Sequence, residues 1–337
     1  MSWSDDDLLL VTGATGLVGS HVAERARKLG IRTRALARPT ADIRLLQQWD
    51  VEIATGSLTE PYAIKGAIQD VTHVVHCAAK VGDWGPVEQY REVNVGGLES
   101  LLEAASENDR LKRFVHISSL GVYPARDHYG TDESVSPNKE GIDGYTLTKV
   151  ESEELFLDYV GRNSLPGLAL RPGFVYGPRD RTVLPRIIER LRDGKFAYLG
   201  SGEQLMNNTF VENLVDAVFL ALDRDDLVGE VFNVTDGRLV SKTEFIETIA
   251  DAVGLKKPTK HVPLGVAKVL ASVMETAWRA LGKDEAPLLS QARIKFLGLN
   301  LDYSIEKAKR ELNYQPKVDF RDGMQRTMEW FREQGVA

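Results

Sequence analysis

Hydrophobic and polar positions in the first half of the chain follow two alternating patterns. Short apolar, β-branched runs are separated by longer stretches in which apolar residues recur every three or four positions. The runs predict buried strands and the stretches predict amphipathic helices, so a parallel sheet with helices on both faces is indicated. The predicted strands are Leu8–Thr12, Arg32–Leu36, Val51–Ala54, His73–Cys77, Phe114–Ser118 and Gly167–Leu170, and the helices between them are Val18–Leu29, Tyr62–Ala67, Val87–Ala105 and Tyr145–Val160.

The second half of the chain is richer in helical periodicity. Ser241 and Glu244 have the spacing of a capping box, which predicts the start of a helix over Glu244–Val253. Glu230–Val234 has the pattern of one more strand. Further helices are predicted at Leu184–Arg192, Val211–Leu222, Leu264–Leu281, Ser304–Leu312 and Gly323–Gln334.

Together the two halves predict an α/β fold. The expected architecture is a Rossmann-type doubly wound parallel sheet with a smaller, mostly helical C-terminal substrate domain. Residues 1–178 are expected to form the dinucleotide-binding domain, and residues 211–236 to return to it. Residues 179–210 and 237–337 are expected to form the substrate-binding cap.

Composition excludes several classes of protein. The hydrophobic share of 43% and charged share of 27% over 337 residues are typical of a soluble globular chain. The net charge of −7 provides no basic surface for nucleic acid. Cys77 is the single cysteine and cannot form an internal disulfide, which fits a reducing compartment. The acidic N-terminus is unlike a signal peptide, and no apolar run reaches the roughly 18 residues of a membrane span, so a cytoplasmic protein is expected.

Three glycines follow the first predicted strand. Gly13, Gly16 and Gly19 lie between the apolar run ending at Thr12 and the helix beginning near Val18. A strand, a glycine turn and a helix start can hold a dinucleotide pyrophosphate, because the backbone N–H groups of the helix start have no partners of their own. The alternative is an ordinary strand–helix turn, and the glycines alone do not decide between the two.

Arg38 lies just beyond the second predicted strand. An acidic side chain there typically holds the ribose 2′-hydroxyl of NAD, whereas an arginine suits the 2′-phosphate of NADP. The residue therefore favours NADP over NAD, and the alternative is a solvated arginine at a strand end.

The strongest candidate for chemistry is a group of three residues. Ser119 follows the fifth predicted strand, and Tyr145 and Lys149 lie four apart on one face of a predicted helix. An ammonium near a phenol stabilises the phenolate and lowers its pKa, so that a tyrosine can exchange a proton with a substrate oxygen. A nearby serine hydroxyl can bind that oxygen as its charge changes.

At this point the sequence resembles the extended short-chain dehydrogenases/reductases. The motifs that carry the resemblance occur in the family's order and span about residues 8–333. They are Thr12–Gly19, Cys77-Ala78-Ala79, Asn94, Ser119–Tyr123, Tyr145-Thr146-Leu147-Thr148-Lys149 and Arg171–Pro178.

The resemblance implies roles for these residues. Ser119, Tyr145 and Lys149 would be the catalytic trio, and Asn94 would fix the active-site helix and a chain of waters. The implied cofactor-binding residues are Gly13, Thr15, Gly16, Leu17, Val18, Arg38, Leu58, Ala78, Ala79, Lys80, Tyr145, Lys149, Pro172 and Val175. One departure is Ser57-Leu58, where the family often has Asp-Leu beside the adenine, so adenine recognition through that side chain is in doubt.

Two stretches indicate a branch of the family. Ala78–Pro86 is similar to the 3β-hydroxysteroid dehydrogenase branch, and most similar within it to bacterial reductases of 2-alkyl-3-oxoalkanoic acids. Nucleotide-sugar epimerases and dehydratases usually carry an arginine at the position of Asn208, where it binds the substrate diphosphate. Trp84 suits an apolar substrate beside the nicotinamide, or is a core aromatic.

These observations predict an NAD(P)-dependent dehydrogenase or reductase, without metal, that interconverts a hydrophobic secondary alcohol and ketone by hydride transfer. The substrate would be steroid-like or a long-chain β-keto or β-hydroxy acid. A nucleotide-sugar epimerase or dehydratase and a non-catalytic cofactor-binding protein are the alternatives. Residues 264–281 are expected to cover an apolar pocket or to contact a membrane surface. A homodimer, paired through residues 87–105 and 145–160, is what the resemblance implies.

Overall fold

Seven parallel strands form the central sheet, in a computed structural model that describes residues 3–140, 143–283 and 285–335. The strand order is β12-β7-β5-β4-β1-β2-β3, so the chain winds outward from β1 in both directions. This topology confirms the predicted Rossmann-type doubly wound sheet. The strands are β1 (Leu8–Thr12), β2 (Arg32–Ala37), β3 (Glu52–Thr55), β4 (His73–His76), β5 (Arg113–Ile117), β7 (Gly167–Pro172) and β12 (Val231–Val234).

Both faces of this sheet are covered, which explains the nearly continuous apolar runs in its strands. Every residue of β1 is buried. Leu9 and Val11 contribute to the core on one face, and Leu8 and Leu10 to the core on the other, as the two-residue period of a strand requires.

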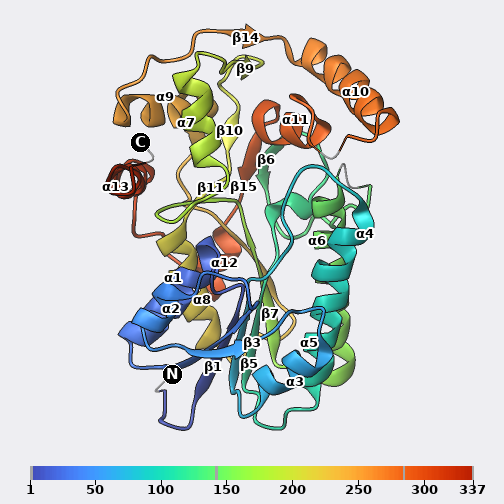
Figure 1. Ribbon diagram of the computed structural model, residues 1–337, viewed down its shortest axis with the longest axis vertical. Coiled ribbons are helices and arrows are strands. Elements are labelled where there is room, and N and C mark those ends of the chain that lie inside the picture. Colours follow the sequence, from blue (N-terminus) through green and yellow to red (C-terminus); the bar gives the residue numbers. More distant parts are fainter. Residues whose placement is uncertain (1–2, 141–142, 284, 336–337) are drawn as a thin grey trace.

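Helices α1 (Leu17–Lys28) and α8 (Val211–Leu222) pack together against the first face of the sheet. The other face is covered by α3 (Pro61–Ile68), α5 (Gly97–Ser106) and α6 (Gly144–Asn163). The short helix α2 (Arg44–Gln48) lies between β2 and β3 in the chain. Figure 1 shows these two helical layers on either side of the sheet.

The stretch predicted as one helix over residues 87–105 is interrupted in the middle. It consists of α4 (Val87–Arg91), a π-helical turn at Glu92–Gly96, and α5. Asn94 lies in the turn. Its side-chain amide accepts a hydrogen bond from Lys80 N and donates to both Lys80 O and Thr148 Oγ1. These bonds tie the π-helical turn to the loop after β4 and to α6.

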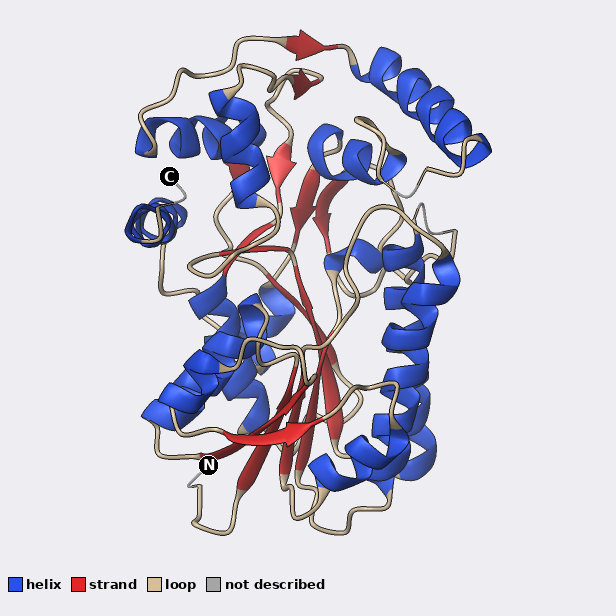
Figure 2. Ribbon diagram, viewed as in Figure 1, coloured by secondary structure: helices blue, strands red, loops and turns tan. Residues whose placement is uncertain are grey.

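A mostly helical cap lies beyond the carboxyl ends of the strands (Figure 2). Its helices are α7 (Leu184–Arg192), α9 (Lys242–Ala252), α10 (Leu264–Ala280), α11 (Gln291–Gly298) and α13 (Phe320–Glu333). Ser241 caps α9 by accepting the Glu244 N–H, as the sequence predicts. Two small pairs stiffen the cap: β9 (Tyr198–Leu199) with β14 (His261–Val262), and β10 (Leu205–Met206) with β13 (Val240–Ser241).

Two further strand pairs join distant parts of the chain. One is β6 (His128–Thr131) with β15 (Leu301–Tyr303), and the other is β8 (Phe174–Tyr176) with β11 (Asn208–Phe210).

The division between the domains crosses the chain several times. Strand β12 pairs with β7, so residues 231–234 belong to the central sheet. The segment around α12 (Glu306–Glu311), which the sequence analysis assigns to the cap, packs Ile305, Ala308 and Tyr314 into the core beside α1 and α8. Among the described residues, no helix combines the length and apolarity needed to cross a bilayer.

Candidate active site

The glycine turn after β1 is shaped by close backbone contacts. Gly13 has a φ of +67°, and a Cβ there would lie 2.7 Å from Ala78 N. A Cβ on Gly19 would lie 2.3 Å from Gly13 O. No other residue type fits either position without a shift of the backbone.

Helix α1 begins directly after this turn, at Leu17. Gly16 is its N-cap and provides no side-chain acceptor, and its first turn contains no acidic residue. The N–H groups at the helix start therefore remain available to an anion, and the helix dipole favours one there. This cradle fits the diphosphate of a dinucleotide, which Gly13, Thr15, Gly16, Leu17 and Val18 would hold.

The other predicted cofactor residues surround the same edge of the sheet. Ala78, Ala79 and Lys80 follow β4 and are half-buried, with Ala78 N donating to Thr12 Oγ1 over 3.3 Å. Leu58 is buried and packs against Gly97. The remaining two are Pro172, at the end of β7, and Val175, on β8.

Arg38 follows β2 at the same edge and is exposed. Among the described residues no side chain forms a hydrogen bond or ion pair with its guanidinium. A cation held at this edge without a carboxylate partner is suited to a phosphate group.

The structure brings Ser119, Tyr145 and Lys149 to the carboxyl end of β5. Ser119 is half-buried and caps a short turn by accepting the Gly121 N–H over 2.9 Å. The side chain of Tyr145, on the first turn of α6, lies near that of Ser119, which acts to lower the pKa of the phenol. Lys149 lies one turn further along α6, is buried, and donates through Nζ to Ile117 O over 2.7 Å.

Burial dominates the electrostatics of this group. It raises the pKa of Tyr145 to about 12, and the nearby Ser119 hydroxyl only partly opposes this effect. It lowers the pKa of Lys149 to about 8, with the thiol of Cys77 and the carboxylate of Glu153 acting in the opposite direction. The sequence analysis expects a lowered pKa for the Tyr145 phenol, but in this structure that pKa is raised.

Helix α6 is held in place from its first residue. Asp143 is its N-cap and accepts the Thr146 N–H over 2.7 Å. Burial raises the pKa of Asp143, against this hydrogen bond. Gly144 lets the ring of Tyr90 pack against the helix start, where a Cβ would lie 2.8 Å from the ring. The position of Tyr145 is therefore fixed by contacts on both sides of the helix start.

A buried ion pair lies beneath the three residues. Arg171, on β7, donates to both carboxylate oxygens of Glu153, on α6, over 2.9 and 2.5 Å. Ser118 Oγ donates to the same carboxylate over 2.5 Å, and Arg171 also donates to the Tyr123 hydroxyl over 2.7 Å. The pair thus joins α6, the end of β5 and β7 at the point where Ser119 and Tyr145 meet.

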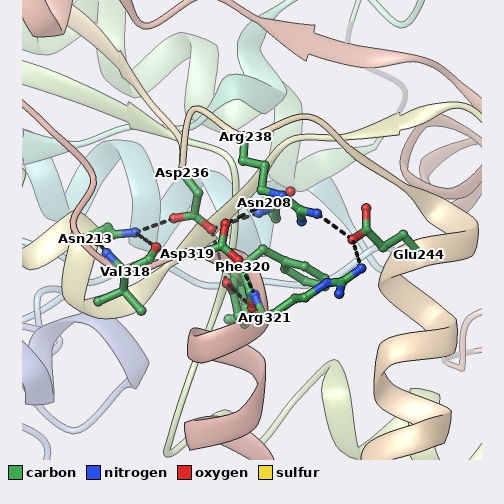
Figure 3. Close-up of polar contacts among 10 residues, drawn as sticks. Asn208, Asn213, Asp236, Arg238, Glu244, Val318, Asp319, Phe320 and Arg321 are labelled. Atoms are coloured by element: carbon green, nitrogen blue, oxygen red, sulfur yellow. Dashed lines mark hydrogen bonds and ion pairs between the residues drawn. The ribbon is translucent and has the colours of Figure 1, made fainter.

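Asn208 is buried in a hydrogen-bond network centred on the carboxylate of Asp236. Figure 3 shows Asn208 and Asn213 directed at the Asp236 carboxylate, to which each donates over 2.8 Å. Phe210 N and the Tyr176 hydroxyl donate to it as well. Burial raises the pKa of Asp236 to about 6, against these four hydrogen bonds. The Asn208 amide thus has a partner within the protein, and a carboxylate lies beside it.

Trp84 lies where the loop after β4 meets the cap. Its Nε1–H donates to Lys283 O over 2.9 Å, and the guanidinium of Arg279 lies over its ring at 5.6 Å. The neighbouring Asp83 forms an ion pair with Arg293 of α11 at 2.6 Å. The polar edge of Trp84 is therefore bound to the cap.

Lys295, on α11, is a residue of this site that the sequence analysis did not identify. Its Nζ donates to Gly121 O and Tyr123 O over 2.7 and 2.8 Å, which ties the cap to the turn that follows Ser119. Burial lowers its pKa to about 8, while the carboxylate of Asp143 acts to raise it. The sequence analysis does not predict α11, although its N-cap Ser290, which accepts the Arg293 N–H, is a local signal for a helix start. The partners of Lys295 are backbone atoms of a distant turn, which no spacing reveals.

Comparison with known proteins identifies the family. Residues 9–235 match the NAD dependent epimerase/dehydratase family. The chain belongs to this family. A ketoreductase from Stigmatella aurantiaca that acts on 4-hydroxy-2-methyl-3-oxo-4-farnesyl-3,4-dihydroquinoline-1-oxide is 30% identical and covers 93% of each chain. The human decarboxylating sterol-4-alpha-carboxylate 3-dehydrogenase is also 30% identical, over 96% of this chain and 87% of the relative.

Solved structures of the family have the same fold. The crystal structure of gox2253 has a TM-score of 0.82 at 28% identity, over 98% of this chain and 99% of the other. MoeE5 in complex with UDP-glucose and NAD has a TM-score of 0.76 at 25% identity, over 97% and 99%. The family confirms the resemblance that the sequence motifs predict, the dependence on NAD and the assignment to the dehydrogenases and reductases. A preference for NADP, the roles of the site residues and the homodimer stay predictions.

The buried ion pair yields a prediction about stability. Replacing Arg171 by Met leaves the Glu153 carboxylate buried without its countercharge, which we expect to lower the free energy of unfolding by about 3–5 kcal/mol. The double variant Arg171→Met/Glu153→Gln removes both charges and should be less destabilised than the sum of the two single variants. Urea denaturation measures each change.

The matched control is Arg162, which pairs with Asp158 on the exposed side of the same helix. Arg162→Ala should change the free energy of unfolding by no more than about 0.5 kcal/mol. Equal losses for Arg171→Met and Arg162→Ala would refute the structural role of the buried pair.

Proposed function

We propose that the protein is an NADP(H)-dependent dehydrogenase or reductase that interconverts a secondary alcohol and a ketone on a hydrophobic substrate. The substrate is steroid-like or a long-chain β-keto or β-hydroxy acid. The observation that carries the proposal is that Ser119, after β5, and Tyr145 and Lys149, one turn apart on α6, meet at the carboxyl end of β5, the sheet edge that also holds the glycine cradle.

The chemistry follows from these three side chains. A bound nicotinamide supplies the hydride or accepts it. In reduction, the Tyr145 hydroxyl gives its proton to the substrate oxygen as that oxygen gains charge, and the Ser119 hydroxyl donates a hydrogen bond to the same atom. The Lys149 ammonium favours the phenolate that remains. The high pKa of Tyr145 keeps the phenol protonated before the reaction begins.

The names of relatives support a hydrophobic ketone. Besides the two relatives described above, a 2-alkyl-3-oxoalkanoate reductase of Shewanella oneidensis is 29% identical over 94% of this chain and 84% of the relative. All three names describe oxidation or reduction at an oxygen-bearing carbon of a largely apolar molecule.

A nucleotide-sugar epimerase or dehydratase is the second candidate, because MoeE5 has the same fold and binds UDP-glucose. The network around Asn208 counts against it. An amide that donates to the Asp236 carboxylate cannot replace an arginine as a ligand for a diphosphate, and the carboxylate itself would repel one.

A substrate screen tests the proposal. The purified protein with NADPH should reduce members of a panel of 3-oxo esters, 3-oxo acids and 3-ketosteroids, which the loss of NADPH absorbance measures. The Tyr145→Phe variant should still bind NADPH but reduce the best substrate at least about a hundredfold more slowly, because no other group at the site is placed to supply the proton.

Two outcomes contradict the proposal. The first is near-wild-type turnover by Tyr145→Phe, which rules out proton transfer by the phenol. The second is stabilisation by UDP-sugars in a thermal-shift assay without reduction of any ketone, which favours the epimerase or dehydratase. Cofactor binding without activity on either panel would favour a non-catalytic protein.

The pKa of Lys149 predicts how activity depends on pH. The ammonium loses its proton near pH 8, so kcat/KM for ketone reduction should be level below pH 8 and fall by about tenfold per unit above it. The buried lysine has a lower pKa than the 10.5 of the unfolded chain, so this group makes the folded state more stable as pH rises from 8 to 10.5. Titration of Lys149 therefore does not unfold the protein in this pH range, and the expected loss of activity reflects the loss of the ammonium charge.

The control is Lys149→Arg, whose guanidinium stays charged throughout this range. Its residual activity should lack the decline above pH 8. A wild-type rate that is constant up to pH 10 would show that the charge of Lys149 is not needed.

Arg38 carries the prediction about the cofactor. Replacing it by Ala should weaken NADPH binding by about ten- to a hundredfold and leave NADH binding nearly unchanged, because only NADPH has the 2′-phosphate. Fluorescence titration measures both affinities. The control is Arg32→Ala, which removes an exposed charge at the opposite end of β2. Tighter binding of NADH than NADPH by the wild-type protein would overturn the preference.

A further inference from the structure

Helix α10 exposes a row of aliphatic side chains on its outer face. Its inner face packs Ala267 and Ala271 against α11. The residues that point away from this contact recur at intervals of three and four, so they form one stripe along the helix. They are Val266, Val269, Leu270, Val273 and, just after the helix, Leu281, with exposed fractions between 45% and 67%.

The position of the helix leaves this stripe on the outside of the molecule. Figure 1 shows α10 at the outer edge of the cap, joined to the rest by β14 on one side and by the segment leading to α11 on the other. Exposed aliphatic side chains gathered on one helix are typical of an interaction surface rather than of a free surface.

Charge distinguishes this part of the chain from the rest. Residues 255–283 contain one acidic residue, Glu275, in a protein whose net charge is −7. Glu275 is buried, accepts the Gln291 N–H over 2.7 Å and lies 3.7 Å from Arg279. Of the basic residues in this stretch, Lys268 and Arg279 lie on α10 and Lys283 follows it. Lys256, Lys257 and Lys260 precede β14, and Lys257 pairs with Glu247 and Asp251 of α9.

We propose that α10 docks the protein on an anionic phospholipid surface, with the apolar stripe inserted among the headgroups and acyl chains and Lys268, Arg279 and Lys283 held near the phosphates. A helix of this length, about 25 Å, can lie in the plane of the interface without crossing it. Lysines beside such a helix are attracted to the negative potential of anionic lipids.

The charge distribution decides against a second copy of the chain as the occupant. A symmetric dimer through α10 would bring the same positive stretch of both copies together, and like charges across an interface repel. An anionic lipid surface is complementary to both features of the helix, the apolar stripe and the positive charge around it. The proposal does not depend on the reaction proposed above, although a hydrophobic substrate would be found at the same surface.

Vesicle binding tests the proposal directly. The full-length protein is sedimented with vesicles of phosphatidylcholine, either alone or with about 30% phosphatidylglycerol. We expect binding to the anionic vesicles, weaker binding to the neutral ones, and a decrease of at least about fivefold when salt is raised from about 0.05 to about 0.5 M.

Three variants separate the contributions. Val269→Asp/Val273→Asp places charges in the stripe and should reduce binding to both kinds of vesicle by at least about tenfold. Lys268→Glu/Lys283→Glu should abolish the preference for anionic vesicles and the sensitivity to salt. The matched control Leu29→Asp/Val228→Asp alters exposed aliphatic residues of the first domain and should bind like the wild type.

NADPH titration of each variant checks the fold and keeps this test separate from the test of the reaction. Two results would overturn the proposal: no sedimentation with anionic vesicles at low salt, or binding by Val269→Asp/Val273→Asp that equals that of the wild type. A dimer, seen by light scattering and lost in this variant, would assign the stripe to a second copy instead.

Discussion

The site depends on one buried interaction, the ion pair between Arg171 and Glu153. These charges come from β7 and α6, which flank the strand that ends in Ser118 and Ser119. Burying either charge alone would cost more than the fold can readily sustain, so each segment holds its position only when the other does. The separation between the Tyr145 hydroxyl and Ser119 is thereby set by a contact that takes no part in the chemistry.

Burial gives the reacting groups pKa values that suit reduction. Burial raises the pKa of Tyr145 to about 12, so the phenol keeps its proton until a substrate oxygen needs it, and lowers that of Lys149 to about 8, so the ammonium is still charged at neutral pH. Two histidines behind Lys149, His76 and His116, are kept neutral by the same effect, since burial lowers their pKa values. These histidines therefore add no positive charge beside Lys149, whose ammonium the proposed reaction uses.

Local patterns predicted the sheet because each strand carries its own signal. A strand such as β1, which is buried on both faces, must be apolar throughout. The positions after it require glycine because a Cβ would collide with nearby backbone, as at Gly19 with Gly13 O. The pattern placed Ser119, Tyr145 and Lys149 on the correct elements for the same reason. It did not predict the π-helical turn at Asn94, whose side chain bonds to Lys80 and Thr148, or the contacts of Lys295, whose partners lie in a turn far away in the sequence. Contacts of this kind leave no periodicity for sequence analysis to find.

The interleaving of the two domains has a consequence for the order in which the protein folds. Strand β15 pairs with β6, and Tyr314 packs into the core beside β12, so the last third of the chain completes structures begun in its first half. Neither the cap nor the sheet is a continuous stretch that can finish folding while the chain is still being synthesised. Contacts between such distant residues form slowly, and during that delay the part of the core that Ile305, Ala308 and Tyr314 cover is exposed. The turn that carries Ser119 is fastened by Lys295 only when nearly the whole chain has left the ribosome.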